Sequence, residues 1–500
     1  MTTTTTSTTR PRALRALLPL LLALAMVAAA CGGDDGGEGA DGNGSGAEDC
    51  PVGAHTEADG RTEITVWHAW VGLTKRTIEA IAEDYNESQD AVTVRVEAQG
   101  TYEELLKKYE DAIADPDSLP DIVLSEDTTT RFMIDSQTIL PAQACIDADP
   151  DAAEIYEDIL PAVTAAYTVE DVLWPAAFSV SSPVLYANLS HLDQAGLPTD
   201  TLPRTLDELR ATAEAIKAAG IAGVDRPLVA RMDSWYLEHL LTGSEQPIVD
   251  KANGRDGLAT TSELDNELTL EVFEWFKSMY DDELLNAIPY SNTYGQLFAM
   301  ALGQSSILID TSTAITSVNS AIEGSLTNED IGAEDLDIDL SAIQLSGLEI
   351  GVGLNPGFEE AGKGQIGGAG WYMVDSGDEA RLAASWDFLK YFNETPQQVR
   401  WTLEGSYLPI SESARQDPEL VEEFETTRRG RWLAIAADSL DALDPDFPGP
   451  VIGPYNQLRS SVRAAMESVT LGGEPAQAMV DKVDQELQAA LDAYAREVGA

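Results

Sequence analysis

The sequence predicts an α/β protein of two domains, each built on a doubly wound sheet with flanking helices. Segments typical of strands alternate with amphipathic segments typical of helices along most of the chain. The roughly 450 residues that follow a short leader are enough for two hydrophobic cores of ordinary size. Strands that are separated by helices pair in parallel through right-handed crossovers, which predicts open sheets.

The first domain begins with five elements in the order β-α-β-α-β. They are expected at residues 64–70, 74–88, 92–98, 102–114 and 121–125. The expected strands are apolar or alternate apolar with polar residues, and the expected helices repeat apolar residues at helical spacing. Ligands of such sheets bind beyond the carboxyl ends of the strands. This rule selects Trp67 and His68, residues 100–102 and residues 125–127 as candidate site positions.

A second α/β unit follows later in the chain. Strands are expected at residues 181–188 and 305–313, and helices at residues 205–220 and 268–285. A glycine-rich passage at residues 354–374 joins two further strands. The C-terminal part is predicted to be helical, most clearly at residues 380–393 and 478–498.

The N-terminus has the features of a secretion signal. Three arginines in residues 10–15 precede residues 16–30, which carry no charge and form a run shorter than the roughly 20 residues of a membrane-spanning helix. Small residues directly before Cys31 resemble the lipobox of bacterial lipoproteins, in which this cysteine is acylated. The alternative is an ordinary cleavage site with an incidental cysteine. Residues 32–49 are rich in glycine and acids, which predicts a flexible spacer after a lipid anchor.

The remaining two cysteines and the net charge constrain the protein further. In an oxidising compartment Cys50 and Cys145 are expected to form a disulfide, with two buried thiols as the alternative. The formal charge of −56 argues against binding to nucleic acid and against broad electrostatic attachment to anionic lipid. It predicts a solvated acidic surface and identifies no ligand.

Motifs of common enzyme classes are missing from the sequence. The four histidines lack metal-binding spacing, and neither a G-x-S-x-G elbow nor a phosphate-binding loop of the G-x-x-x-x-G-K-[ST] type occurs. The pattern at Gly362, Gly364 and Gly367 precedes a strand-like segment, whereas the dinucleotide fingerprint needs a helix there. We therefore expect no cofactor and no metal. A carboxylate pair of the glycosidase kind stays open, because the chain has 86 acidic residues.

Several motifs resemble those of the extracellular solute-binding proteins of bacterial ABC importers. They are "ITVWHAW", "GTYEEL", "SSPVLYAN", "GPYNQLRSSVRAAMESVTLGG" and the stretch from "GGAGWYMV" to "GSYLPI". The resemblance runs from residue 62 to residue 490 and is closest to the branch that binds glycerol-3-phosphate and glycerophosphodiesters. It implies a two-lobe periplasmic-binding-protein-like fold of type II, hinged around a central cleft.

The resemblance also implies a set of ligand-binding residues. They are Tyr102, Asp127, Ser181, Ser312, Gly368, Tyr407 and Arg459. Glu126 is an alternative to Asp127, and Thr313 an alternative to Ser312. Arg459 is expected to bind a phosphate, because a planar guanidinium presents paired donors to its oxygens. Trp67, Trp70 and Trp371 add flat apolar faces that suit a sugar or a glycerol chain, and Trp67 and Trp371 are predicted to contact the ligand.

The lobes are expected to be built from separate stretches of chain. The expected ranges are a signal peptide at 1–30, a lipidated linker at 31–60, the first lobe at 61–176 and 364–406, and the second lobe at 177–363 and 407–500. The resemblance implies a monomeric, lipid-anchored receptor on the outer face of the cell membrane that delivers a polyol or sugar to ABC permease subunits. The alternatives are an oligosaccharide receptor of the same family, a secreted carbohydrate hydrolase and an adhesion or scaffold lipoprotein.

Overall fold

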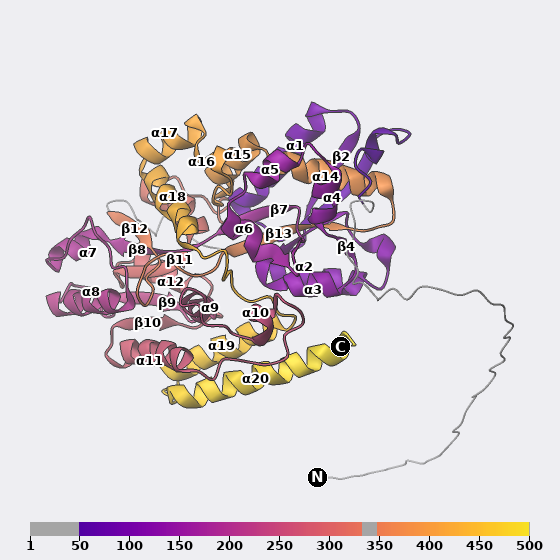
Figure 1. The fold of residues 1–500 in the computed structure, drawn as a ribbon. Coiled ribbons are helices and arrows are strands. Elements are labelled where there is room, and N and C mark those ends of the chain that lie inside the picture. Colours follow the sequence, from indigo (N-terminus) through magenta and orange to yellow (C-terminus); the bar gives the residue numbers. More distant parts are fainter. Residues whose placement is uncertain (1–49, 333–347, 500) are drawn as a thin grey trace, which may run out of the picture. The chain divides into compact units, whose positions relative to one another are not determined.

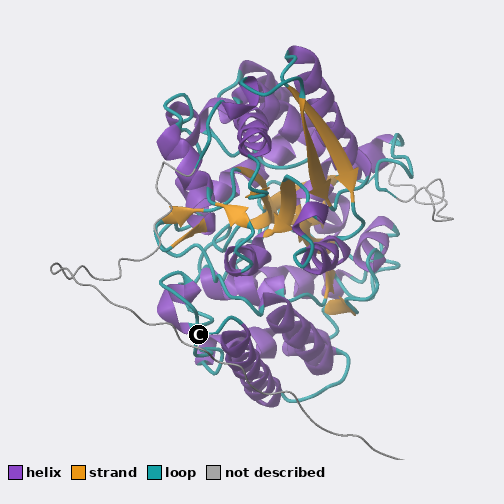
Figure 2. Cartoon of the chain, turned by 90° about the vertical axis from the view of Figure 1, so that its right-hand side faces the viewer, coloured by secondary structure: helices purple, strands orange, loops and turns teal. Residues whose placement is uncertain are grey.

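The computed structural model describes residues 50–332 and 348–499, all of which belong to one compact unit (Figure 1). The predicted signal peptide, the lipidated Cys31 and the linker as far as residue 49 lie outside the described residues. Two sheets form the centre of the fold, and helices flank the strands of both (Figure 2).

The first sheet has the strand order β2-β1-β3-β13-β4, and β7 also pairs with β13. Its strands are β1 (Thr62–His68), β2 (Val92–Ala98), β3 (Ile122–Glu126), β4 (Ile139–Leu140), β7 (Ala177–Ser181) and β13 (Gly367–Val374). β1 pairs in parallel with β2 and β3, as the β-α-β-α-β order predicts. β13 returns from the far end of the chain and pairs antiparallel with β3, β4 and β7, so the sheet is mixed.

The second sheet has the strand order β10-β9-β11-β8-β12. Its strands are β8 (Pro183–Asn188), β9 (Leu228–Arg231), β10 (Leu285–Ile288), β11 (Ile307–Thr311) and β12 (Ile350–Leu354). β9 is parallel to β10 and β11, whereas β8 is antiparallel to β11 and β12. A hairpin of β5 (Thr168–Val169) and β6 (Val172–Leu173) lies outside both sheets.

The chain crosses between the two sheets at positions that matter for the site. β7 belongs to the first sheet although the predicted lobe boundaries assign it to the second lobe, and β8 starts only two residues after it. The chain then returns between β12 and β13. Residues 181–183 and 355–366 are therefore two connections between the sheets.

The helices fall into three groups by their place in the chain relative to β8, β12 and β13. Those before β8 are α1 (Gly72–Ser88), α2 (Tyr102–Ala112), α3 (Thr130–Asp135), α4 (Ala142–Ala148), α5 (Ala153–Glu157) and α6 (Pro161–Tyr167). Those between β8 and β12 are α7 (Leu189–Gln194), α8 (Leu206–Ala219), α9 (Trp235–Thr242), α10 (Asp250–Gly254), α11 (Glu267–Asp281), α12 (Gly295–Ala301) and α13 (Ile315–Glu323). Those after β13 are α14 (Glu379–Asn393), α15 (Thr395–Gly405), α16 (Glu412–Arg415), α17 (Pro418–Thr426), α18 (Arg428–Asp438), α19 (Tyr455–Thr470) and α20 (Ala476–Glu497).

Local sequence explains where several helices begin and end. α2 starts at a capping box, in which the Thr101 hydroxyl accepts from the backbone of Glu104 and the Glu104 carboxylate accepts from the backbone of Thr101. α8 stops at Gly220, whose left-handed backbone suits a residue without Cβ. The prediction of one helix over residues 268–285 was wrong at its end. α11 ends at Asp281 because Glu283 adopts a left-handed conformation, and β10 begins at Leu285.

A disulfide joins the first described residue to the first lobe. Cys50 is bonded to Cys145 in α4, with 5.1 Å between their Cα atoms. Both cysteines are buried among the core residues around the first sheet. The start of the described chain is thereby attached covalently to α4.

Candidate functional site

A polar cavity of about 240 Å³ lies between groups of the first sheet and groups of the second. The first sheet contributes residues at the end of β3 and the start of β13, and the second contributes the ends of β9 and β11 with side chains of α9 and α19. The position follows the rule that ligands bind beyond the carboxyl ends of strands. The charged residues that line this cavity are Glu126, Asp127, Arg231, Asp233, Asp310, Arg459 and Arg463.

Arg459 occupies one end of the cavity and is held by two carboxylates. Its Nη1 donates to Oε1 of Glu126 at 2.8 Å, and its Nη2 donates to Oε2 of Glu238 at 2.9 Å. Its Nε donates to both Glu238 oxygens, at 3.1 and 3.3 Å. Glu126 ends β3 of the first sheet, whereas α19 packs on α11, which packs on β10 of the second sheet. The ion pair therefore bridges the two walls of the cavity.

Glu238 is the one acid in α9, a helix of mostly apolar residues. α9 is buried along almost its whole length, and the Glu238 side chain is 1% exposed. A buried carboxylate needs partners, and here Arg459, the Tyr455 hydroxyl at 3.2 Å and the Gln365 amide at 3.5 Å donate to it. Although burial acts against it, Glu238 and Glu126 hold the pKa of Arg459 well above its ordinary value, so the guanidinium stays charged.

Asp127 lies beside this ion pair, at the first residue after β3. Burial raises the pKa of Asp127 to about 8, and the nearby Glu126 and Glu238 act in the same direction, while Arg459 opposes them. At neutral pH its carboxyl group is therefore largely protonated. A protonated carboxyl group can donate a hydrogen bond to a ligand as well as accept one.

A second charged cluster occupies another part of the cavity. Asp233 accepts from Arg231 Nη2 at 3.2 Å and from Arg463 Nε at 2.9 Å. Both guanidinium groups also lie over the ring of Tyr290, at 4.5 Å and 3.8 Å from its centroid. Although burial acts to raise it, Arg463 and Arg231 hold the pKa of Asp233 below its ordinary value. Two cations thus share one ionised carboxylate.

Ser181 and Gly368 line the cavity where the chain crosses between the sheets. Gly368 has φ 121°, and a Cβ at this position would collide with the carbonyl oxygen of Ser179 on the paired strand β7. This explains the need for glycine. Ser312 is completely buried beside this crossing, where it accepts from the Ser182 backbone at 3.1 Å and donates its own backbone N–H to Ser182 at 2.8 Å. It holds the crossing segment, and Thr311 takes its place in the cavity lining.

Tyr102 and Tyr407 lie next to the cavity, in a cluster of their own. The Trp70 indole donates to the Tyr102 hydroxyl at 3.0 Å and to the Tyr407 hydroxyl at 2.9 Å. Tyr407 stacks on Trp401, with ring centroids 5.4 Å apart. Tyr102 lines a narrow neighbouring pocket that shares Glu126 with the polar cavity.

Trp67 and Trp371, predicted to contact the ligand, do not line the polar cavity. Trp67 points to the side of β1 that packs on α2, among Leu105 and Tyr109, because side chains alternate along a strand. The Lys108 amine lies 3.7 Å from the centre of its ring. Trp371 lies in β13 and packs edge-on against Trp70 in the core.

Sequence reasoning missed the residues that complete the cavity. They include Arg231, Asp233, Trp235, Tyr290, Asp310 and Arg463 in the lining, and Glu238, which holds Arg459 without lining the cavity. Arg231 and Asp233 follow the apolar strand β9, where the strand-end rule could have found them. Arg463 lies four residues after Arg459 in one helix, so both side chains are on the same face. Glu238 is the single acid in an apolar helix, which is itself a signal.

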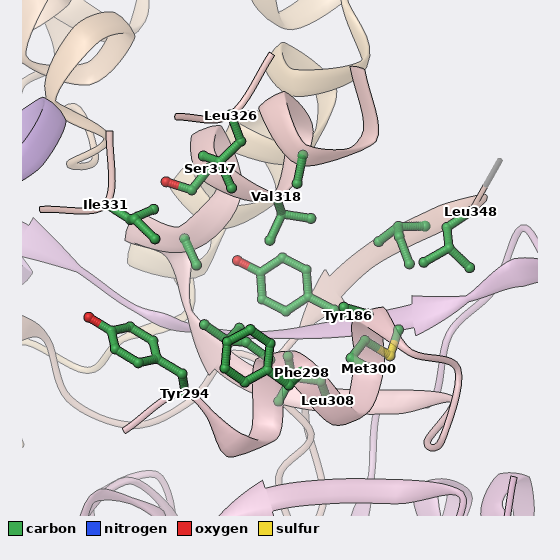
Figure 3. A pocket seen from close by; sticks show the side chains of 15 residues that line it. Tyr186, Tyr294, Phe298, Met300, Leu308, Ser317, Val318, Leu326, Ile331 and Leu348 are labelled. Atoms are coloured by element: carbon green, nitrogen blue, oxygen red, sulfur yellow. The ribbon is translucent and has the colours of Figure 1, made fainter. Parts of the chain in front are cut away.

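A second cavity has the opposite character (Figure 3). It has a volume of about 140 Å³ and lies on the second sheet, between β8, β11, α12 and α13. Tyr186, Leu308, Phe298, Met300 and Val318 are among the side chains that line it (Figure 3). Among the described residues that line it, none carries a charge.

Residues 50–332 and 348–499 contain neither a cluster of metal ligands nor a membrane-spanning helix. Within these ranges the acids, histidines and cysteines form no group suited to a metal ion. The helices within the same ranges are too short or too polar to cross a bilayer.

The two lobes and the polar cavity between them define a protein that encloses a small polar solute. The profile of the family described as "Bacterial extracellular solute-binding protein" matches residues 80–426. The chain therefore belongs to this family of solute-binding receptors. The two-lobe α/β fold that the resemblance implied is confirmed.

Individual relatives agree with this assignment. The sn-glycerol-3-phosphate-binding periplasmic protein UgpB of Yersinia pseudotuberculosis is 26% identical over 433 residues, which cover 84% of this chain and 90% of the relative. The crystal structure of UgpB from Mycobacterium tuberculosis in complex with glycerophosphocholine shares the fold, with a TM-score of 0.66 and 18% identity. The match covers 87% of this chain and 100% of that chain. The crystal structure of the cyclic α-maltosyl-1,6-maltose binding protein from Arthrobacter globiformis also has a TM-score of 0.66, with 19% identity. This match covers 86% of this chain and 99% of that chain.

Proposed function

We propose that this chain is a lipid-anchored receptor that binds glycerol-3-phosphate or a glycerophosphodiester and delivers it to an ABC importer. The proposal rests mainly on one observation. Three of the chain's 30 lysines and arginines, Arg231, Arg459 and Arg463, line one cavity together with four acids, in a protein whose formal charge is −56. Positive groups gathered in this way suit an anionic ligand, because arginine presents paired donors to phosphate oxygens and stays charged when desolvated.

Two further observations support a small phosphorylated polyol. Relatives that align with most of the chain carry names stating that they bind glycerol-3-phosphate. The cavity volume of about 240 Å³ lies below the range of roughly 300–1,000 Å³ that is usual for drug-sized ligands. A glycerol phosphate also has both the anion and the hydroxyl groups that the charged and neutral donors of this cavity would bind.

The proposed mechanism of closure depends on contacts that the solute makes with both sides of the polar cavity. A solute that contacts Asp127 and Gly368 on one wall and Arg459 and Arg463 on the other binds the closed form better than the open form. It shifts the equilibrium toward closure by this difference in affinity alone. The two connections at residues 181–183 and 355–366 are where the hinge would lie. The lipid at Cys31 would keep the receptor near the permease at high effective concentration.

An oligosaccharide ligand is the second candidate. Sugar-binding proteins share this fold, as the Arthrobacter globiformis structure shows. Carboxylates and the aromatic Trp235 also line the cavity, and such groups bind sugar hydroxyls and C–H faces.

Calorimetry of the purified protein distinguishes the candidates. We expect glycerol-3-phosphate or glycerophosphocholine to bind with a Kd of about 1 μM or tighter, equivalent to about −8 kcal/mol. Maltose and trehalose should bind at least about 100-fold more weakly, because neutral sugars leave the arginine donors unpaired. Each ligand should be recovered chemically unchanged. Tighter binding of maltose or trehalose would establish the oligosaccharide reading, and recovery of a hydrolysed ligand would establish an enzyme.

A further inference from the structure

The three arginines of the polar cavity are not equivalent, although all belong to one site. Arg459 pairs with two carboxylates, Glu126 and Glu238, and uses its Nε, Nη1 and Nη2 to do so. Arg231 and Arg463 share a single carboxylate, that of Asp233, and each uses one nitrogen for it. Counted by these hydrogen-bonded partners, the first cluster has two carboxylates for one guanidinium group, and the second has one carboxylate for two guanidinium groups. The Asp310 carboxyl group lines the same cavity and also interacts with Arg231.

The two clusters also differ in how many guanidinium N–H groups have no hydrogen-bond partner. Among the described residues, both Nη groups of Arg463 and the Nε and Nη1 of Arg231 have no hydrogen-bond partner. These side chains are 18% and 24% exposed and line the cavity, so their donors are partly accessible to solvent or to a ligand. Tyr290 holds both guanidinium planes by cation–π contacts and leaves their edges for hydrogen bonds.

An anion would be repelled at the other cluster. A phosphate that approached Arg459 would meet the Glu126 and Glu238 carboxylates that already accept from this guanidinium. Hydroxyl groups avoid this conflict, because each can donate to Glu126 while it accepts from Arg459 or from Asp127. The Arg459 cluster is therefore suited to a neutral polyol.

We propose that Arg231 and Arg463 together hold the phosphoryl oxygens of the solute, and that Arg459, Glu126 and Asp127 bind its hydroxyl groups. The assignment rests on the proposed function and replaces Arg459 as the phosphate-binding residue. Arg459 and Arg463 are four residues apart on one face of α19, which separates their Cβ atoms by roughly 6 Å. A glycerol phosphate is long enough to reach both clusters at once.

Two probes test the proposal separately from the function. The first is glycerol-3-phosphate, measured by calorimetry with the wild type, Arg231→Gln and Arg463→Gln. The second is inorganic phosphate, measured as the shift of the thermal unfolding midpoint with the wild type, the Arg231→Gln/Arg463→Gln double variant and Arg459→Gln. The matched control is Arg210→Gln. Arg210 belongs to α8, pairs with Glu214 and lies outside the cavity, so this variant removes a cation that the proposal does not use.

The expected results separate the two clusters. Each single variant should weaken glycerol-3-phosphate binding by about 10- to 100-fold, as expected for lost charge-assisted hydrogen bonds. The weakened binding should also depend less on salt. Phosphate should raise the unfolding midpoint of the wild type and of Arg459→Gln but not that of the double variant, and Arg210→Gln should behave as the wild type.

Failure of the arginine assignment and failure of the proposed function would give different results. If the wild type binds glycerol-3-phosphate but both single variants bind it within twofold, the assignment of Arg231 and Arg463 is wrong and the proposed function stands. If the wild type binds no phosphate ester, the proposed function is wrong, and the inorganic phosphate arm still decides the anion site. A phosphate effect that persists in the double variant, vanishes in Arg459→Gln or is missing from the wild type overturns the assignment. Unfolding without ligand shows that each variant is folded.

Discussion

The second sheet borders two cavities whose linings are chemically opposite. One is charged and about 240 Å³ in volume, and the other is apolar and about 140 Å³. Both use β11 and α12: Leu308 and Phe298 line the apolar cavity, whereas Ile309 and Gln296 line the polar one. Since side chains alternate along a strand and rotate around a helix, one pair of elements can serve both.

The difference shows what each cavity does. An apolar cavity leaves no polar group unsatisfied, so it costs only lost packing contacts. The polar cavity removes four carboxyl groups and three guanidinium groups partly from water, which costs free energy unless each charge has a partner. Such an arrangement adds little stability and provides donors and acceptors for a ligand. The contrast is the reason why the proposed function places the ligand in the polar cavity, although the apolar cavity is the more enclosed by hydrophobic side chains.

Placing a charge in the apolar cavity should have the largest effect. Leu308→Asp puts a carboxylate at a position that is 2% exposed and offers it no partner. We expect a loss of more than about 4 kcal/mol in the free energy of unfolding, measured by urea denaturation. Leu308→Met is the control and should cost less than about 1.5 kcal/mol. A loss below about 1 kcal/mol for Leu308→Asp would mean that water reaches this cavity freely.

Removing a carboxylate from the polar cavity should have the next largest effect. Glu238→Ala leaves Arg459 with Glu126 as its remaining ion-pair partner, and we expect a loss of about 3 kcal/mol in the free energy of unfolding. The double variant Glu238→Ala/Arg459→Met should recover part of this loss, because the uncompensated cation is gone. Additive losses in the double-mutant cycle would show that the pair does not act as a unit.

The smallest effect should come from Asp127 and should depend on pH. The pKa of Asp127 is raised to about 8 in the folded protein, so between pH 4 and pH 8 the folded state holds a proton that the unfolded state releases. Stability therefore falls as pH rises through this window. Asp127→Asn removes the effect, so the variant should gain at least about 1.4 kcal/mol relative to the wild type on going from pH 5 to pH 8.

Chemical denaturation at the two pH values measures this gain. Asp117→Asn, at an exposed position, is the control and should change the unfolding free energy by less than about 0.5 kcal/mol at either pH. A gain for Asp127→Asn that is equal at pH 5 and pH 8 would show that Asp127 is ionised throughout.

Periodicity in the sequence was sufficient for most of the fold. The alternation at residues 92–98 predicts β2 with its observed bounds, and the β-α-β-α-β order predicts the parallel pairing of β1, β2 and β3. Local patterns could not predict that β13 inserts antiparallel beside β3, because this pairing joins residues about 250 positions apart. They also missed the end of α11 at Asp281, which depends on the left-handed backbone of Glu283.

The site was predictable only in part. The motifs led to Asp127, Ser181, Gly368 and Arg459, which the structure brings to one cavity. They could not show that Arg459 is already paired with two acids, since Glu126 and Glu238 come from distant segments. The face of β1 that carries Trp67 depends on which helix covers it, and that too is set by tertiary packing.

The bond between Cys50 and Cys145 has a mechanical consequence for the first lobe. It closes a loop with a sequence separation of 95 residues that includes β1, β2 and β3. Tension on the chain ahead of Cys50 passes through sulfur to α4, so these strands cannot be peeled from the sheet edge while the bond is intact. A force on the chain ahead of Cys50 would therefore move the first lobe as one body and leave the walls of the polar cavity undistorted.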